Sequence, residues 1–178
     1  MQKQKFIRPE HVLLEAGLKP EMFVADLGVG SGFFTLPASV IVGDQGRIWA
    51  VDVLESALSK VSSSARLQGR KNIRTLRHNL DGYNESAIEE LSCDLAVIGK
   101  VLPQMKHPEN LVRETYRILK TGGKVVIVEW KKEHTKLGPP YEMRIAPEKA
   151  KEIFTAKGFK FLRELEPDGF HYALLLEK

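Results

Sequence analysis

The chain has 178 residues, of which 43% are hydrophobic and 28% are charged, and its formal net charge at pH 7 is +4. These values are typical of one globular domain over residues 1–178 that is large enough to bury a proper core. No apolar run approaches membrane-spanning length, and residues 1–11 lack the apolar core of a signal peptide, so neither a membrane span nor export is expected.

Strand-like and helix-like segments alternate along the chain. Several of the predicted helices begin at a proline and end at a glycine, as Pro9 and Gly17 do around the first of them. In chain order, the predicted elements are helix 9–17, strand 22–28, helix 31–43, strand 46–53, helix 55–69, strand 72–79, helix 84–91, strand 93–99, helix 108–123, strand 124–130, helix 147–158, and strands 159–166 and 170–178.

This alternation predicts an α/β fold. Continuous apolar strands that are separated by helices pack into a parallel sheet covered on both faces. The last two strands are joined only by Pro167–Gly169, a turn that forces an antiparallel hairpin. We therefore predict a doubly wound, three-layer α/β/α sheet of seven strands, mostly parallel with one antiparallel edge strand.

Three glycines, Gly28, Gly30 and Gly32, occupy alternate positions between the first strand and the next helix. Glycine is entropically costly there, so we infer that a ligand approaches the backbone closely. In such sheets, ligands bind beyond the carboxyl ends of the strands, near the point where the strand order reverses. A helix that begins near Ser31 would also offer free amides to a carboxylate or a phosphate.

The glycine spacing argues against a dinucleotide site. Such a site has the pattern Gly-x-Gly-x-x-Gly, whereas here the sixth position is Phe33 and the third glycine comes one residue early. Asp52 ends the second strand and is placed to accept hydrogen bonds from both hydroxyls of a ribose. Because its carboxylate would repel a 2′-phosphate, NADP is disfavoured, and a nicotinamide dehydrogenase is a weak alternative.

With these features in place, the chain resembles the class I S-adenosylmethionine-dependent methyltransferases, which have a Rossmann-like fold. It is most similar to the small type 11 domains that are related to quinone-biosynthesis methyltransferases. The resemblance runs from Arg8 to Lys178, with Thr121 where the family usually has proline. The segments that carry it are VADLGVGSGFFTLP, GRIWAVDV, CDLAVIGKVL, PENLVRETYRILKTGGKVVIVEW, GPPYEMRI and GFHYALLLEK.

The resemblance implies a role for each matching residue. Asp26 would help to hold the amino-acid end of the cofactor, Asp52 the ribose, and Asn79 the adenine amino group, at a position where the family usually has Asp. Lys100 stands where the family often has Asn and would act through its backbone. The implied S-adenosylmethionine-binding residues are Asp26, Gly28, Gly30, Gly32, Asp52, Val53, Asn79, Gly99 and Lys100.

The sequence does not assign a catalytic base or a metal site. The methyl donor carries the reactive group itself, so neither a triad nor a metal is required. Pro103–Gln104 stands where many relatives have His-His, which leaves the loop residues His107 and His134 as weaker candidates. His171 is expected to pack or to lie at a strand edge, far from the carboxyl ends of the parallel strands.

The acceptor pocket is expected to form from residues 129–145, which overlap residues 132–148, the longest stretch without clear periodicity. It includes Arg144, which could bind an anionic acceptor or pair structurally with Glu142 or Glu148. We predict an S-adenosylmethionine-dependent methyltransferase, most simply one with a small-molecule acceptor. The alternatives are an RNA or protein methyltransferase and a non-catalytic cofactor-binding subunit.

The remaining features bear on partners and location. The basic groups are spread along the chain and favour solvated faces over a nucleic-acid patch. The one cysteine, Cys93, cannot form an internal disulfide, which favours a reducing, cytoplasmic setting. The oligomeric state is not indicated.

Overall fold

The computed structural model describes residues 6–178, so residues 1–5 of the N-terminus predicted to lack an export signal lie outside it. Proline stands at the start of three α-helices, where its missing N–H costs nothing. The elements are α1 (Pro9–Glu15), β1 (Phe23–Leu27), α2 (Thr35–Val42), β2 (Arg47–Asp52), α3 (Glu55–Leu67), β3 (Ile73–Arg77), β4 (Cys93–Gly99), η1 (Leu102–Gln104), α4 (Pro108–Ile118), β5 (Leu119–Trp130), η2 (Tyr141–Met143), α5 (Pro147–Thr155), β6 (Lys160–Leu165) and β7 (His171–Glu177).

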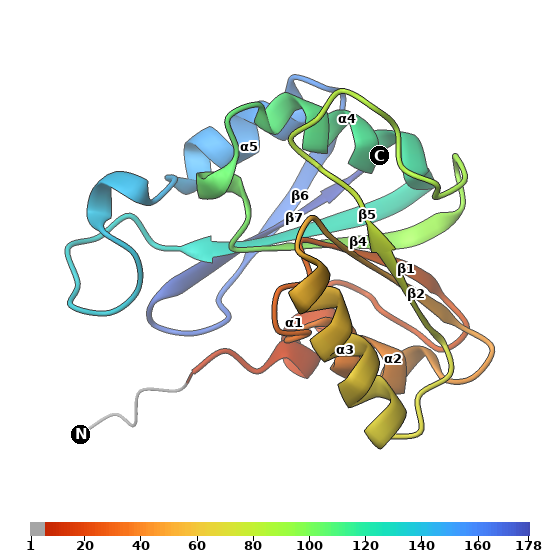
Figure 1. Ribbon diagram of the computed structural model, residues 1–178. Coiled ribbons are helices and arrows are strands. Elements are labelled where there is room, and N and C mark those ends of the chain that lie inside the picture. The colour runs from red at the N-terminus through yellow and green to blue at the C-terminus, as the bar shows by residue number, and fades with distance from the viewer. Residues whose placement is uncertain (1–5) are drawn as a thin grey trace.

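The strands form one seven-stranded sheet in the order β3-β2-β1-β4-β5-β7-β6 (Figure 1). The first five strands of the chain pair in parallel, and β7 is antiparallel to both of its neighbours. The predicted fold class is confirmed, and the reversed strand lies one position in from the edge, which is formed by β6. The strand order reverses between β1 and β4, where a doubly wound sheet binds its ligands.

Successive side chains along each strand pack on opposite faces of the sheet, so each face has its own hydrophobic core. On β1, Val24 packs with α1 and α2, while Ala25 packs with the core under α4 and α5. The same alternation on β5 places Val126 in the first core and Val125 in the second. Helices α1, α2 and α3 therefore cover one face of the sheet, and α4 and α5 cover the other (Figure 1).

The predicted helix over residues 84–91 is wrong, because this segment forms turns and bends. Side chains of α4 replace the hydrogen bonds that a helix would have made. The Glu114 carboxylate accepts the Ser86 N–H at 3.1 Å, and the Arg117 guanidinium donates to the carbonyls of Ser86 and Ile88 at 3.3 and 2.7 Å. These backbone groups of the segment are therefore paired without the hydrogen bonds of a helix.

Residues 6–178 offer neither a membrane-spanning helix nor a metal site. No helix in this part of the chain is long and apolar enough to cross a membrane. Within the same residues, no group of three or more His, Cys, Asp or Glu side chains is placed to hold a metal ion.

Candidate functional site

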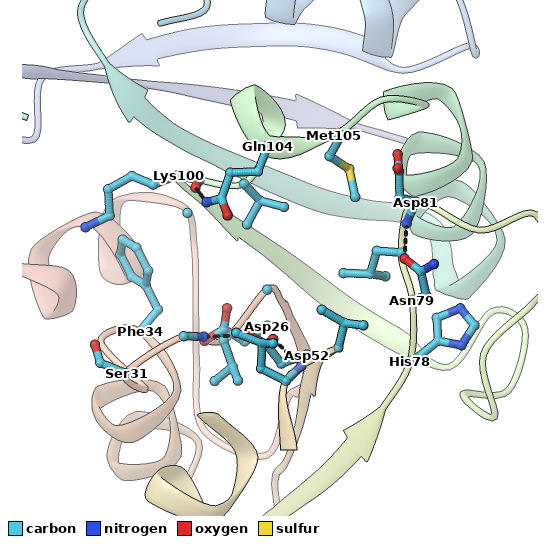
Figure 2. A pocket seen from close by; sticks show the side chains of 18 of the residues that line it. Asp26, Ser31, Phe34, Asp52, His78, Asn79, Asp81, Lys100, Gln104 and Met105 are labelled. Atoms are coloured by element: carbon cyan, nitrogen blue, oxygen red, sulfur yellow. Dashed lines mark hydrogen bonds between the residues drawn. The ribbon is translucent and has the colours of Figure 1, made fainter. Parts of the chain in front are cut away.

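A cavity of about 560 Å³ opens at the carboxyl ends of the central strands, beside the point where the strand order reverses. Figure 2 shows Asp26 and Asp52 at its centre, with His78 and Asn79 on one side and Lys100 on the other. The residues of the predicted cofactor set that line the cavity are Asp26, Gly28, Gly30, Asp52, Val53, Asn79, Gly99 and Lys100.

Gly32, the remaining member of that set, does not line the cavity. A Cβ atom at this position would lie 3.1 Å from Val61 Cγ2, so the residue faces α3. The alternating glycines of the sequence therefore serve two different surfaces, because only Gly28 and Gly30 face the cavity.

Gly28 allows the turn after β1 to contact the loop after β4. Its φ is +90°, and a Cβ atom there would lie 2.3 Å from Val101 Cγ2. Gly30 has a φ of +51° with nothing within 4 Å of its Cβ position. No side chain therefore separates the main chain from the cavity at Gly30, so a ligand can approach the backbone closely there, as the glycine spacing predicts.

The carboxylate of Asp52 is held in place by two backbone amides. Its Oδ2 accepts the Gly30 N–H and its Oδ1 accepts the Leu54 N–H, both at 2.9 Å. These bonds tie the end of β2 to the glycine turn. A carboxylate oxygen accepts more than one hydrogen bond, so both oxygens of the oriented group still have acceptor capacity.

Asp26 is a buried acid on the floor of the cavity, with 3% of its surface exposed. Burial raises the pKa of this carboxyl to about 6, and hydrogen bonds from Thr35 oppose the shift. The Thr35 hydroxyl donates to Asp26 Oδ2 at 2.5 Å. Because Thr35 is the first residue of α2, this helix begins four residues later than Ser31, where its N-terminus was predicted.

The side of the cavity formed after β3 is polar. The Asn79 Oδ1 accepts the Asp81 N–H at 3.1 Å (Figure 2). The Asp81 Oδ1 in turn accepts the His107 N–H at 2.6 Å. The first bond uses one lone pair of the Asn79 oxygen and leaves acceptor capacity for a ligand. Val53, on the neighbouring strand end, is 49% exposed.

Two features shape the chain at the end of β4, namely the aromatic ring of Phe34 and the unusual backbone conformation of Lys100. A Cβ at Gly99 would lie 2.8 Å from Phe34 Cε2, so this glycine makes room for the ring. Lys100 has a φ of +61°, which is unusual for a residue with a side chain. Its N–H donates to the Val128 carbonyl at 2.8 Å, and its carbonyl accepts the Gln104 side-chain amide at 2.7 Å.

Sequence reasoning missed several residues of the lining, among them Val101, Gln104 and Met105. They lie in or beside η1, a short element with no periodic pattern. The contact between Val101 and Gly28 joins residues far apart in the sequence, so nothing local predicts it.

Glu129, the next-to-last residue of β5 and part of the expected acceptor pocket, does not line the cavity. It is 1% exposed and lies behind η1, where its Oε1 accepts the Leu102 N–H at 3.0 Å. Burial raises the pKa of this carboxyl to about 8, against the hydrogen bonds from Leu102 and Val101. Its Oε2 is buried without a hydrogen-bond partner in the described part of the chain.

Arg144 organises the connection after β5. Its guanidinium, in a residue 3% exposed, donates hydrogen bonds to the hydroxyl of Thr135 and to backbone carbonyls of the same connection. The carbonyls belong to Lys131, Glu133, Leu137 and Pro139. Its role is thus structural, but neither Glu142 nor Glu148 is among these partners.

The prediction that His171 lies far from the carboxyl ends of the parallel strands is wrong. Because β7 runs antiparallel to β5, its first residue, His171, pairs with Trp130 at the end of β5. The imidazole Nδ1 lies 2.9 Å from Asp168 Oδ2, and burial lowers the pKa of this histidine despite the carboxylate. The ring is nearly buried against Trp130, with 4.0 Å between ring centroids.

The other candidate histidines lie outside the cavity as well. His134 stacks on Tyr141 at 4.1 Å, and the His107 side chain is 62% exposed beside Glu109. His78 is the histidine that lines the cavity among residues 6–178. The geometry therefore brings neither His107 nor His134, the candidate bases of the sequence, to the cavity.

A doubly wound sheet with a reversed strand β7 and an acidic cavity at its switch point define a class I S-adenosylmethionine-dependent methyltransferase fold. Comparison with known families agrees, because the family model of the ubiE/COQ5 methyltransferase family matches residues 2–164. The chain belongs to the ubiE/COQ5 methyltransferase family, which confirms the class predicted from the sequence.

Individual relatives support this assignment. The chain is 28% identical over 162 residues to the ubiquinone/menaquinone biosynthesis C-methyltransferase UbiE of Shewanella sediminis, covering 86% of this chain and 63% of that protein. It is 30% identical to the demethylmenaquinone methyltransferase of Lactococcus lactis over 60% of this chain and 41% of that protein. The chain thus spans less than two thirds of the length of these curated relatives.

The structure of a SAM-dependent methyltransferase from Aquifex aeolicus is similar over almost its whole length. The TM-score is 0.90 at 27% sequence identity, with 97% of this chain and 90% of that chain covered. The likeness therefore includes the two edge strands of the sheet, β3 and β6, as well as its central strands.

Proposed function

We propose that this protein transfers the methyl group of S-adenosylmethionine to a small-molecule acceptor, and that the cavity beside β1, β2 and β4 holds the cofactor. One observation carries the proposal. The Asp52 carboxylate is fixed by the amides of Gly30 and Leu54 at the rim of a cavity of about 560 Å³, next to bare glycine backbone. A carboxylate so oriented suits a ribose, and a cavity of this size suits a cofactor.

The residues present fit this cofactor. Asp52 would accept the ribose hydroxyls, Asn79 would bind the adenine edge, and Asp26 would attract the ammonium group of the amino-acid end. When bound, S-adenosylmethionine supplies an electrophilic methyl group. The chain then has to align that group with an acceptor and to exclude water, which are the usual contributions of a protein to such a reaction.

The acidic lining adds an electrostatic contribution. Asp26 titrates near pH 6 and is therefore mostly ionised at neutral pH, so the floor of the cavity is negative. Negative charge that is fixed in a partly buried site favours a cationic ligand more than it does in water. The site thus favours a sulfonium cofactor over its neutral product, which helps the product to leave.

We infer a small and largely apolar acceptor that reaches the cavity beside Val101 and Met105. The names of the curated relatives, which are C-methyltransferases of ubiquinone and menaquinone biosynthesis, support a quinone-type compound. We also propose a cytoplasmic setting, in which the buried thiol of Cys93 stays reduced.

Titration calorimetry with S-adenosylhomocysteine tests the cofactor site. Asp52→Ala removes two charge-assisted hydrogen bonds to the ribose and should weaken binding by about 2–4 kcal/mol. Asp52→Asn keeps an acceptor oxygen and should lose less. Asp44→Ala, which removes an exposed carboxylate outside the cavity, is the control and should bind as the wild type does.

Two results would overturn this proposal. One is the absence of any heat of binding for wild-type protein that is shown to be folded by its unfolding transition. The other is an affinity of folded Asp52→Ala equal to that of the wild type.

A further inference from the structure

Acidic side chains outnumber basic ones in the lining of the cavity. Three carboxylates line it, from Asp26, Asp52 and Asp81, and Lys100 is the one Lys or Arg among the described residues of the lining. We propose that the Lys100 ammonium binds the carboxylate of the amino-acid end of S-adenosylmethionine. This inference rests on the proposed function and assigns the side chain a role that the resemblance gave only to its backbone.

The backbone at Lys100 is held in one conformation from both sides. The N–H donates to the Val128 carbonyl at 2.8 Å, and the carbonyl accepts the Gln104 amide at 2.7 Å. With φ at +61°, the residue is in the left-handed region, which a side-chain-bearing residue adopts only where its surroundings determine it. Such outliers cluster at ligand sites, so the position of this lysine is constrained at a place where a ligand is expected.

The side chain lies at the end of the cavity opposite to His78 and Asn79. Figure 2 places it on the side of Ser31 and Phe34, with the two central aspartates between these ends. Its Nζ lies 5.2 Å from the centre of the Phe33 ring, and within residues 6–178 it makes no salt bridge. An ammonium group on an aromatic face and without a carboxylate partner is available to a ligand anion.

The chemistry of the cofactor supplies the matching anion. Its sulfonium and its ammonium group are positive and suit the aspartates, whereas its α-carboxylate would be repelled by them. The adenosine part binds at the other end of the cavity, near Asn79. The carboxylate therefore belongs beside the one cation at this end, which is Lys100.

The test compares two ligands that differ only at the amino-acid end. S-Adenosylhomocysteine has the α-carboxylate and the α-ammonium group, and 5′-methylthioadenosine has the same adenosine and thioether without either. Calorimetry on Lys100→Met should show about tenfold weaker binding of S-adenosylhomocysteine and less than about a threefold change for 5′-methylthioadenosine. Lys100→Arg keeps the charge and should retain most of the affinity for both ligands.

Lys106→Met is the matched control, because Lys106 is exposed and does not line the cavity. It should leave both affinities unchanged. The salt concentration provides a second measurement. The preference of the wild type for S-adenosylhomocysteine over 5′-methylthioadenosine should shrink as the salt concentration rises, since salt screens charge pairs, and it should shrink less in Lys100→Met, which lacks the pair with the carboxylate.

The outcomes separate this inference from the proposed function. Equal losses for both ligands in Lys100→Met, or no loss for either, would overturn the role of Lys100 while leaving the cofactor site intact. A wild-type preference that does not depend on salt would also count against it. If folded wild-type protein binds neither ligand, both proposals fail.

Discussion

The carboxyl edge of the sheet has two halves of opposite character. Beside β1, β2 and β4 it is hollow, lined by carboxylates and formed by short turns. Beside β5 and β7 it is filled by Trp130, Arg144 and His171, which lie under a long connection. The difference is that the first half leaves a preformed space, which we propose receives the cofactor, whereas the second half is filled by its own side chains.

The largest effect is expected for Gly28→Ala in the hollow half. The new Cβ would lie 2.3 Å from Val101 Cγ2 at a φ of +90°. Strain and overpacking together should cost about 3 kcal/mol of the free energy of unfolding and should abolish the binding of S-adenosylhomocysteine. Urea denaturation and calorimetry measure the two losses.

Two variants sharpen this prediction. Gly28→Ala combined with Val101→Ala removes the clash but not the strain, so it should recover part of the stability. Gly30→Ala meets nothing within 4 Å and should cost less stability than Gly28→Ala. A Gly28→Ala protein as stable as the wild type would show that the two loops do not constrain each other.

Arg144→Met tests the filled half. It removes the donors that hold the carbonyls of the connection, at a cost of about 2 kcal/mol in the free energy of unfolding. Trypsin should then cut faster at Lys131, Lys132 and Lys136, which the connection contains. The affinity for S-adenosylhomocysteine should stay the same, because Arg144 does not line the cavity. A parallel loss of affinity would contradict the division into two halves.

The smallest effect is a change in the pH dependence of stability in Glu129→Gln. Burial raises the pKa of Glu129 from 4.5 to about 8, so between these values the folded protein holds a proton that the unfolded chain has lost. Stability therefore falls as the pH rises through this window, by up to about 1.4 kcal/mol per pH unit.

Glutamine does not titrate, so the variant should lack this part of the slope. Its free energy of unfolding relative to the wild type should increase from pH 5 to pH 8, as measured by urea denaturation at both values. Glu133→Gln, at an exposed position of the same connection, is the control and should follow the wild type. Parallel profiles for Glu129→Gln and the wild type would mean that Glu129 is not buried in solution.

The hollow half could be predicted from the sequence because its signals are local. Asp52 ends a strand, and Gly28 and Gly30 follow one, so each position depends on its immediate neighbours. Gly32 shows the limit of this reasoning. It has the same spacing as the other two glycines, but it faces Val61 of α3.

The filled half depends on contacts between distant segments. His171 reaches the end of β5 because β7 is inserted between β5 and β6, which no periodicity in the chain indicates. Most partners of Arg144 are backbone carbonyls, which every residue type provides, so its charge pointed instead to an anionic acceptor or to Glu142 or Glu148. The segment over residues 84–91 has a helical pattern, but side chains of α4 satisfy its backbone.

The self-contained bonding of the connection after β5 has a practical consequence. Because Arg144 binds carbonyls of its own segment, residues 131–144 form a module that is bonded within itself and contacts Trp130 at the end of β5. Such a module can be exchanged between homologous proteins without rebuilding the rest of the domain. Loop grafting at these boundaries would thus change this half of the sheet edge while leaving the residues that line the cavity unchanged.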